Sequence, residues 1–195
     1  MGAGPKPVPM RSRALLALFF LCAPAALAKD RAVLIYPRER AFFRRVFYTP
    51  HQSALKRRLA KTYDVQVHNQ IATEEDFFKI DVDGAKLLVI SGHGDAFSIS
   101  MNGRKTPTLD STDAERLEKF FSRLDPYATI VLQSCETGRG FAHLVKEAAG
   151  PTRRVIAARG EIPWNGMRIT SVEPFDVTIR CRDGSRRWDC TLRLQ

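Results

Sequence analysis

ATIVLQSCETGRG, residues 128–140, combines an apolar run with a cysteine and a turn. The first five residues have the composition of a strand buried on both faces. Cys135 follows this run, and Gly138 and Gly140 mark a turn. A cysteine in such a place is a small core residue, half of a disulfide, or a nucleophile held at the end of a strand.

A second segment, AKLLVISGHGD (residues 85–95), has the same arrangement. Its nearly continuous apolar run predicts another strand buried on both faces, and His93 follows the run between two glycines. In open α/β sheets, functional sites gather beyond the carboxyl ends of the strands. If the two strands are neighbours, about 5 Å apart, His93 and Cys135 lie at the same edge of the sheet.

Strands and helices are predicted to alternate along the chain. The predicted strands are 31–37, 64–69, 85–95, 128–134 and 153–158, and the predicted helices are 38–45, 49–63, 72–81, 111–125 and 140–150. A small hairpin is predicted at 96–109, and Thr112 and Glu115 have the spacing of a capping box. This order is typical of an α/β sandwich with a mainly parallel central sheet.

The N-terminal segment has the pattern of an export signal. MRSRALLALFFLCAPAALA (residues 10–28) contains two arginines, an apolar run and a small-x-small end at 26–28. The apolar run is too short for a helix that spans a membrane. We therefore expect a signal peptide at residues 1–28, cleaved after Ala28, and a single domain at 29–195. The expected location is secreted or periplasmic, with no transmembrane segment.

Export changes what the cysteines are expected to do. Cys181 and Cys190 lie in two alternating runs that flank an Asp-Gly turn signal at 183–184, within a predicted C-terminal β-hairpin at 172–195. Facing each other across the hairpin, they can form a disulfide in an oxidising compartment. Cys135 is then single, which makes it a candidate reactive thiol. An intermolecular disulfide through Cys135 is a further alternative.

The composition, 44% hydrophobic and 27% charged, is that of an ordinary globular protein, and the net charge is +10. This charge suits an anionic partner, and it fits an arginine-rich surface without a specific partner equally well. The basic residues are scattered and lack interleaved aromatics, so no nucleic-acid partner is expected. The histidines lack the spacing of metal ligands, so neither a metal site nor a cofactor is expected.

His93 and Cys135 together fit nucleophilic catalysis. A thiol is mostly protonated at neutral pH, and a nearby imidazole can take its proton and later protonate a leaving amine. Glycines beside the histidine let N–H groups approach a substrate carbonyl, so the amides of Gly94 and Cys135 are candidates for an oxyanion hole. Taken singly, a cysteine at the end of a buried strand is usually a small core residue, and a lone Gly-His-Gly is usually a turn. Asp95 either orients His93 or serves as a turn residue.

LLVISGHGD followed by TIVLQSCETGRG resembles the caspase-like fold of the clan CD cysteine peptidases, which include caspases, gingipains, legumains, separases and CHAT domains. In that family a histidine followed by glycine ends one strand, and the nucleophilic cysteine ends the next core strand. Cys-Glu-Thr-Gly at 135–138 is most similar to the CHAT motif, whereas 133–134 depart from its usual Ser-Ala. The resemblance covers about residues 31–165 and implies a caspase-like three-layer α/β sandwich. It gives Glu136 no chemical step, and we expect Glu136 to pair with Arg139.

The resemblance implies an exported cysteine endopeptidase for protein or peptide substrates, with Cys135 as the nucleophile and His93 handling the proton. Family members often build the selectivity pocket where Arg159, Glu161 and Trp164 lie in this chain. Arg159 favours an acidic substrate side chain and Glu161 a basic one. Ordinary loop charges and a packed aromatic are the commoner explanation of these residues. The alternative function is a non-catalytic CHAT-like binding or interaction module in the cell envelope. No oligomeric state is predicted.

Overall fold

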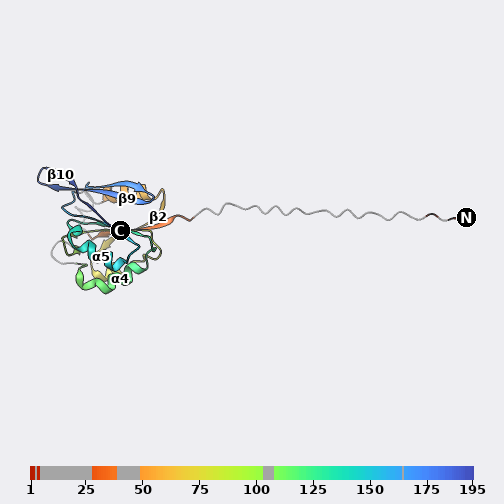
Figure 1. Cartoon of the computed structure of the whole chain (residues 1–195), viewed down its shortest axis with the longest axis horizontal. Coiled ribbons are helices and arrows are strands. Elements are labelled where there is room, and N and C mark those ends of the chain that lie inside the picture. The colour runs from red at the N-terminus through yellow and green to blue at the C-terminus, as the bar shows by residue number, and fades with distance from the viewer. Residues whose placement is uncertain (3, 5–27, 39–48, 103–107, 164) are drawn as a thin grey trace.

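The computed structural model of the chain describes residues 1–2, 4, 28–38, 49–102, 108–163 and 165–195. Its centre is a six-stranded sheet with the order β11-β7-β6-β3-β1-β2 (Figure 1). Five strands run parallel: β1 (Asp30–Pro37), β2 (Tyr63–Ile71), β3 (Leu87–Ser91), β6 (Thr129–Gln133) and β7 (Arg154–Ala158). The last strand, β11 (Thr191–Leu194), is antiparallel to β7. The predicted α/β class and mainly parallel sheet are confirmed.

Two of the predicted segments fall outside the described residues. All but a few positions of the predicted signal peptide at residues 1–28 lie there, and so does the predicted helix at 38–45 after its first residue. The other predicted helices are present with shorter bounds. They are α2 (Thr49–Leu59), α3 (Glu74–Phe78), α4 (Ala114–Ser122) and α5 (Phe141–Ala149).

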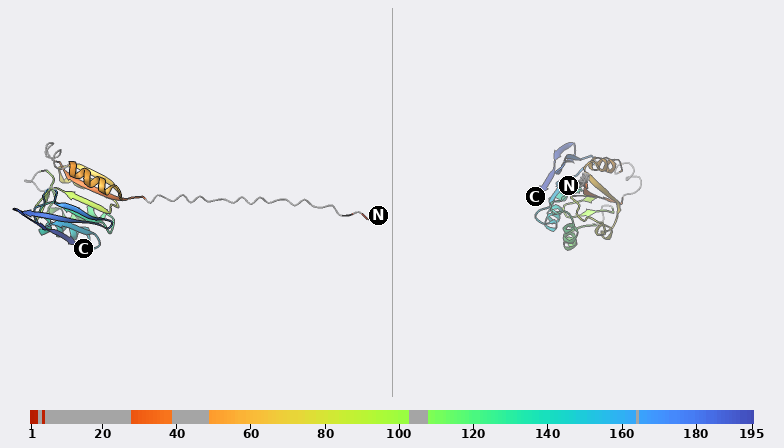
Figure 2. Two further views of the ribbon diagram at one scale, coloured as in Figure 1. Left: turned by 90° about the horizontal axis from the view of Figure 1, so that it is seen from above. Right: turned by 90° about the vertical axis from the view of Figure 1, so that its right-hand side faces the viewer.

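The central sheet is covered on both faces. Its first face packs against α3, α4 and α5, which bury Phe77, Phe121 and Phe141 against the strands. The second face carries α2 together with a three-stranded antiparallel sheet (Figure 2). The strands of this smaller sheet are β8 (Met167–Val172), β9 (Phe175–Asp183) and β10 (Arg186–Asp189). Three layers are therefore present, and one outer layer mixes a helix with strands.

The helix α4 confirms its predicted buried face and corrects its predicted cap. Its buried residues include Leu117, Phe120 and Phe121, at the spacing of one helix face. The capping box predicted from Thr112 and Glu115 is wrong, because a short 3-10 turn, η2 (Ser111–Asp113), precedes the helix. Asp110 caps that turn instead, and its carboxylate accepts from the Thr112 amide at 2.8 Å and from the Thr112 hydroxyl at 2.6 Å.

The C-terminal segment differs from the single hairpin predicted at 172–195. β9 and β10 do form a hairpin that turns at Gly184, but β8 pairs with the other side of β9 and β11 joins the central sheet. The predicted disulfide between Cys181 and Cys190 is present. The two cysteines do not face each other across the hairpin, because Trp188 is the register partner of Cys181 and Cys190 follows β10.

The hairpin predicted at 96–109 is described in part. The amides of Ile99 and Leu109 each donate to the carbonyl of the other at 3.0 Å, so the predicted pairing exists, while 103–107 lie outside the described residues. In addition, β5 (Ile99–Ser100) pairs with β4 (His93–Gly94), which makes a tighter hairpin that the sequence did not predict. His93 therefore begins a short paired strand.

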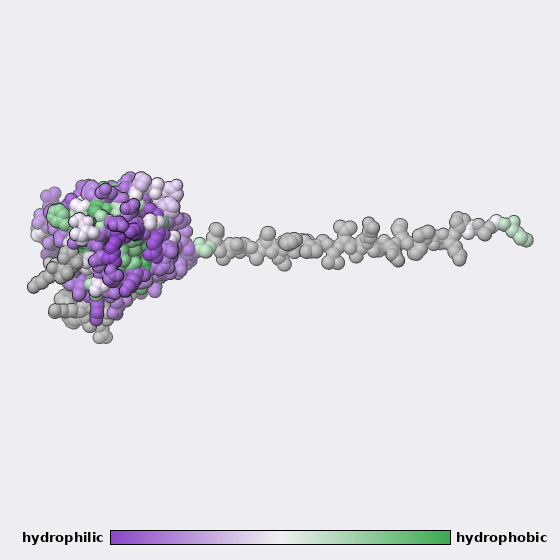
Figure 3. All heavy atoms as spheres, turned by 90° about the horizontal axis from the view of Figure 1, so that it is seen from below, coloured by the Kyte–Doolittle hydropathy of each residue, from purple (hydrophilic) through white to green (hydrophobic). Residues whose placement is uncertain are grey.

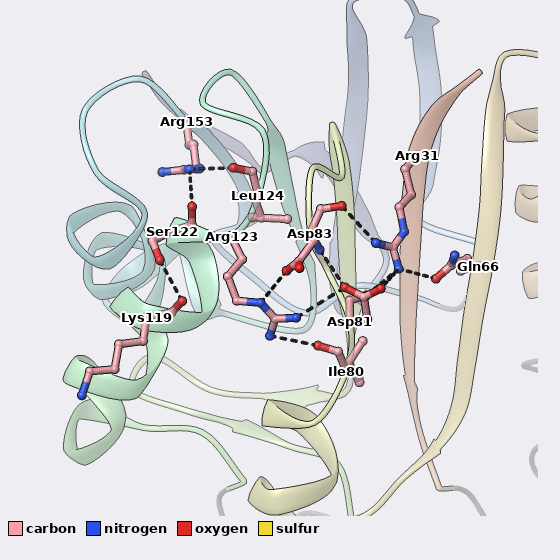
Figure 4. A network of polar contacts seen from close by, with 10 residues as sticks. All are labelled: Arg31, Gln66, Ile80, Asp81, Asp83, Lys119, Ser122, Arg123, Leu124 and Arg153. Carbon is pink, nitrogen blue, oxygen red and sulfur yellow. Dashed lines mark hydrogen bonds and ion pairs between the residues drawn. The ribbon is translucent and has the colours of Figure 1, made fainter. Parts of the chain in front are cut away.

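A polar network lies at the amino edge of the parallel sheet (Figure 4). His93 and Cys135 follow the carboxyl ends of β3 and β6, at the opposite edge. Arg31 donates to the Asp81 carboxylate at 2.9 Å, and Arg123 donates to the Asp83 carboxylate at 2.6 Å. Arg153 donates to main-chain carbonyls at and just after the end of α4. The hydrogen bond from Arg31 lowers the pKa of Asp81. These contacts fix the amino ends of the strands. They do not involve the carboxyl ends, where His93 and Cys135 lie.

The surface is mostly hydrophilic on the face shown in Figure 3, with smaller hydrophobic areas between polar side chains. Across the described ranges, no helix combines the length and apolar character needed to cross a bilayer. Within those same ranges, no group of three or more histidine, cysteine or acidic side chains is arranged to hold a metal ion.

Candidate active site

The register of β3 and β6 sets the positions of His93 and Cys135. Ser91 pairs with Gln133 at the last rung between these strands, and each candidate lies two residues beyond that rung. The Ser91 hydroxyl donates to Gln133 Oε1 at 2.9 Å across the same rung. The two strands are therefore neighbours that end level, and they deliver His93 and Cys135 to one edge of the sheet.

Gly94 lies directly against the main chain of Cys135. A Cβ atom on Gly94 would lie 2.6 Å from the Cys135 carbonyl oxygen and 2.7 Å from Ser134 Cβ, closer than such atoms approach. A second contact joins the same two loops, because the Phe141 amide donates to the Ala96 carbonyl at 2.7 Å. The main chains of Gly94 and Cys135, which carry the candidate oxyanion donors, are therefore in contact.

The loop after β7, residues 159–162, lies beside Cys135 and contacts it. The Glu136 amide donates to the Gly160 carbonyl at 3.0 Å, and the Ile162 amide donates to Cys135 Sγ at 3.4 Å. Cys135 is a half-buried thiol outside the disulfide. A hydrogen-bond donor at sulfur favours the ionised form of the thiol, which is the nucleophilic form.

Glu136 has a strained backbone directly after Cys135. Its φ is +58°, and in the part of the chain that the structure describes it is the one non-glycine residue with a positive φ. This conformation costs about 1–2 kcal/mol for an L-residue and recurs at functional sites. The Glu136 carboxylate pairs with Arg139 at 3.1 Å, as predicted. The strained residue turns the chain from β6 into a short 3-10 helix, η3 (Thr137–Arg139).

The disulfide packs against the 159–162 loop, which also contacts Cys135. A Cβ atom on Gly160 would lie 3.2 Å from Cys181 Sγ, so the loop packs on the disulfide sulfur. The Arg159 amide also donates to the Cys190 carbonyl at 3.0 Å. A continuous set of contacts therefore runs from the disulfide through this loop to Cys135.

The predicted selectivity pocket is only partly described. Arg159 and Glu161 are exposed on the loop beside Cys135, with buried Gly160 between them. Trp164 lies outside the described residues. The structure thus places Arg159 and Glu161 near the nucleophile candidate, and their role in selecting a substrate stays a prediction.

Asp95 serves the turn after His93. Its carboxylate accepts from the amide of Phe97 at 2.7 Å and from the amide of Ser98 at 2.9 Å. The Ser98 hydroxyl donates to the same carboxylate at 3.0 Å. Of the two predicted roles, this geometry fits the turn residue, and it fixes the loop that carries His93.

Tyr36 is a further polar group at this edge, and the sequence did not single it out. It lies one residue past the rung between Ile35 of β1 and Ile90 of β3. The side chain is buried, and burial raises the pKa of the phenol, so the hydroxyl stays protonated at neutral pH. Among the described residues, the Tyr36 hydroxyl has no hydrogen-bond partner.

The site also contains a contact that the sequence could not reveal. The Ile162 amide reaches Cys135 Sγ through the main chain, so no residue type marks it. The positive φ of Glu136 was partly foreseeable from the sequence, because a turn was predicted directly after Cys135.

Known proteins add no evidence on the family. Comparison of the chain with protein-family models gives no match, and comparison with curated proteins gives none either. The family resemblance therefore depends on the motif residues, and the function must be argued from the geometry of the strand ends.

Proposed function

We propose that the protein is a caspase-like cysteine endopeptidase in which Cys135 is the nucleophile and His93 is the general base and acid. The observation that carries this proposal is the shared rung of Ser91 and Gln133, which lies two residues before each candidate. A thiol and an imidazole at the level ends of neighbouring strands form the pair that nucleophilic catalysis requires.

The proposed reaction uses groups that all belong to this edge. His93 takes the proton of the Cys135 thiol, and the sulfur attacks the carbonyl carbon of a peptide bond. The amides of Gly94 and Cys135 donate to the oxyanion of the tetrahedral intermediate. His93 then protonates the leaving amine, and a thioester forms. Water attacks the thioester with His93 as the base, which releases the carboxylate and restores the thiol.

The surroundings of Cys135 support a nucleophilic role. The hydrogen bond from the Ile162 amide to Cys135 Sγ favours the thiolate. The strained backbone of Glu136 turns the chain directly after Cys135, and such strain recurs at functional sites. A cysteine that only fills a core has no need of either feature. The exposed Arg159 and Glu161 stand on the loop that would meet the substrate next to the scissile bond.

The test is cleavage of a peptide library by matched variants. We expect Cys135→Ala and His93→Ala each to lower the cleavage rate by at least about 100-fold, as loss of a nucleophile or a general base does. Two variants serve as controls and should keep the activity. Ser134→Ala truncates the side chain next to Cys135, and His143→Ala removes an exposed histidine of α5. Equal turnover by wild type and Cys135→Ala would refute the proposal.

A non-catalytic binding module is the second candidate function. The net charge of +10 and a cavity lined by several arginines favour it. Absence of cleavage by the wild type, together with salt-sensitive binding of an anionic partner by both wild type and Cys135→Ala, would select this candidate.

A further inference from the structure

A cavity of about 460 Å³ lies between α2 and the outer face of the antiparallel sheet β8–β10. Four arginine side chains line it, and each comes from a different element: Arg58 of α2, Arg168 of β8, Arg180 of β9 and Arg187 of β10. The other lining residues are Asn165, Gly166, Ile169, Thr170 and Thr178. No acidic residue lines this cavity among those the structure describes.

The alternation of the strands explains why the arginines gather. Ile169 and Ile179 are buried against the central sheet, so the residues next to them point to the outer face. Arg168 is the register partner of Thr178, which puts a guanidinium beside a hydroxyl. Arg187 is the register partner of Arg182, and like charges opposite each other destabilise a sheet. The pair of Arg187 and Arg182 therefore does not stabilise the sheet, whereas Arg180 is opposite Asp189.

The nearest carboxylates neutralise only part of the positive charge at the cavity. Asp189 is opposite Arg180 in the register, and its carboxylate accepts from the amide and the hydroxyl of Thr191. Asp176 binds the guanidinium of Arg193. Within the described part of the chain, no ion pair or side-chain hydrogen bond engages Arg58, Arg168, Arg180 or Arg187. Asp189 therefore compensates part of the charge of Arg180, while Arg58, Arg168 and Arg187 face the same small space without an ion pair among the described residues.

We propose that this cavity binds a ligand that carries two or more phosphate groups. A phosphate monoester has a charge near −2, so two such groups match the charge of four guanidinium groups. Four carboxylates would be needed for the same charge, and they would fit less easily into this volume. The guanidinium fork matches phosphate oxygens with paired N–H donors, and Thr178 and Asn165 add further donors. The volume suits a small ligand or a headgroup. This site is separate from the proposed peptidase chemistry.

The test compares two double variants of equal charge. Arg58→Gln/Arg187→Gln removes two cavity arginines, and Arg57→Gln/Arg186→Gln removes their sequence neighbours, which do not line the cavity. Calorimetric titration of the protein with tripolyphosphate should show one site in the wild type and the control variant. Binding to the cavity variant should weaken by at least about 100-fold, about tenfold for each charge-assisted contact. Equal weakening in both variants, or no binding to the wild type, would overturn the proposal.

Two further measurements identify the ligand class and its source. Polyglutamate of matched charge should compete poorly, and competition as strong as that of tripolyphosphate would overturn the phosphate assignment. Cardiolipin vesicles test a lipid headgroup as the source. Cosedimentation that Arg58→Gln/Arg187→Gln abolishes supports a headgroup, and tripolyphosphate binding without cosedimentation supports a free phosphate compound.

A measurement on the wild type keeps the proposal testable if the cavity variant fails to fold. Phenylglyoxal modifies accessible arginines, and mass spectrometry locates the products. Tripolyphosphate should protect Arg168 and Arg187 and leave Arg57 and Arg186 reactive. Uniform protection, or none, would contradict a defined site.

Discussion

Ser91 and Gln133 are register partners at the last rung of β3 and β6, and the Ser91 hydroxyl donates to Gln133 Oε1 at 2.9 Å. Because His93 and Cys135 each lie two residues beyond this rung, it sets the relative height of both candidates. Ser91→Ala removes the donor and adds no atoms to this buried position. We expect it to lower the free energy of unfolding by about 1 kcal/mol and to change the alkylation rate of Cys135.

The matching control for this prediction is Thr129→Val, at the other end of β6. It also removes a buried hydroxyl, but it lies at the edge far from Cys135. Urea denaturation gives the stability, and mass spectrometry after iodoacetamide treatment gives the alkylation rate. If both variants alter alkylation equally, the rung does not set the position of the thiol.

Gly94 has no room for a side chain. A methyl group there would meet the Cys135 carbonyl oxygen at 2.6 Å, and main-chain atoms cannot move aside as a flexible side chain can. We expect Gly94→Ala to cost about 3 kcal/mol, at the upper end for overpacking. Gly84→Ala is the control: its methyl group meets nothing within 4 Å, and its φ of +65° should cost only about 1 kcal/mol. Thermal denaturation measures both, and equal costs would argue against the contact.

The backbone strain at Glu136 predicts an unusual order of stabilities. Glycine accepts a φ of +58° without the penalty that other residues meet, so Glu136→Gly should be neutral or stabilise the protein by about 1 kcal/mol. The lost pair with Arg139 is half-exposed and subtracts little. Glu136→Val, which is β-branched, should destabilise by more than 1 kcal/mol. Denaturant unfolding checks the order, and a stable valine variant would contradict it.

The parts of the fold that the sequence predicts are those with strong local patterns. The double-sided apolar runs of β3 and β6 and the spaced apolar face of α4 are local signals, and they identified the central sheet and one covering layer. β8 was missed because Met167 and Ile169 alternate over only a few residues next to a proline- and glycine-containing loop.

The strand β11 shows a different limit. It alternates like β9 and lies next to the hairpin, so a continuing hairpin was the local prediction. Its pairing with β7 depends on which edge of the central sheet is open, and a local pattern carries no information on this.

The same distinction holds at the candidate site. The positions of His93 and Cys135 followed from strand ends, which are local. The Ile162 amide at Cys135 Sγ and the buried hydroxyl of Tyr36 depend on long-range packing. The disulfide pair was predictable because only Cys181 and Cys190 share a segment, but its contact with the loop beside Cys135 was not.

The disulfide should support Cys135 as well as the fold. Cys181→Ala/Cys190→Ala should lower the free energy of unfolding by about 2–3 kcal/mol for a closed loop of this length. Because Gly160 packs on Cys181 Sγ and its loop donates to Cys135 Sγ, alkylation of Cys135 should also change in the folded state. The control is a core change away from this loop, Val145→Ala in α5, which should destabilise without changing alkylation. Unchanged alkylation in the cysteine variant would show that the loop holds its place without the disulfide.

Asp176 joins the two sheets and should make stability depend on acid pH. Its carboxylate accepts two hydrogen bonds at 3.0 Å from Arg193 of β11 and one at 3.1 Å from Thr170 of β8. Burial alone would raise the pKa of Asp176, but the hydrogen bonds and charge of Arg193, with the bond from Thr170, outweigh it and lower the pKa below 3.8. As the pH falls past 3.8, the carboxylate therefore takes up a proton in the unfolded chain before it does so in the folded one.

The stabilisation by Asp176 is therefore complete above about pH 5 and is lost as the pH falls through the lowered pKa. Asp176→Asn should be less stable than wild type by about 1–2 kcal/mol at pH 7, and this difference should shrink below about pH 4. Asp183→Asn, an exposed change beside the turn of the same hairpin, should differ little from wild type at either pH. Denaturant unfolding at pH 7, 5 and 3.5 measures the three proteins. The lowered pKa of Asp176 requires the stability difference between wild type and Asp176→Asn to shrink as the pH falls. A difference that stays constant from pH 7 to pH 3.5 would contradict this prediction.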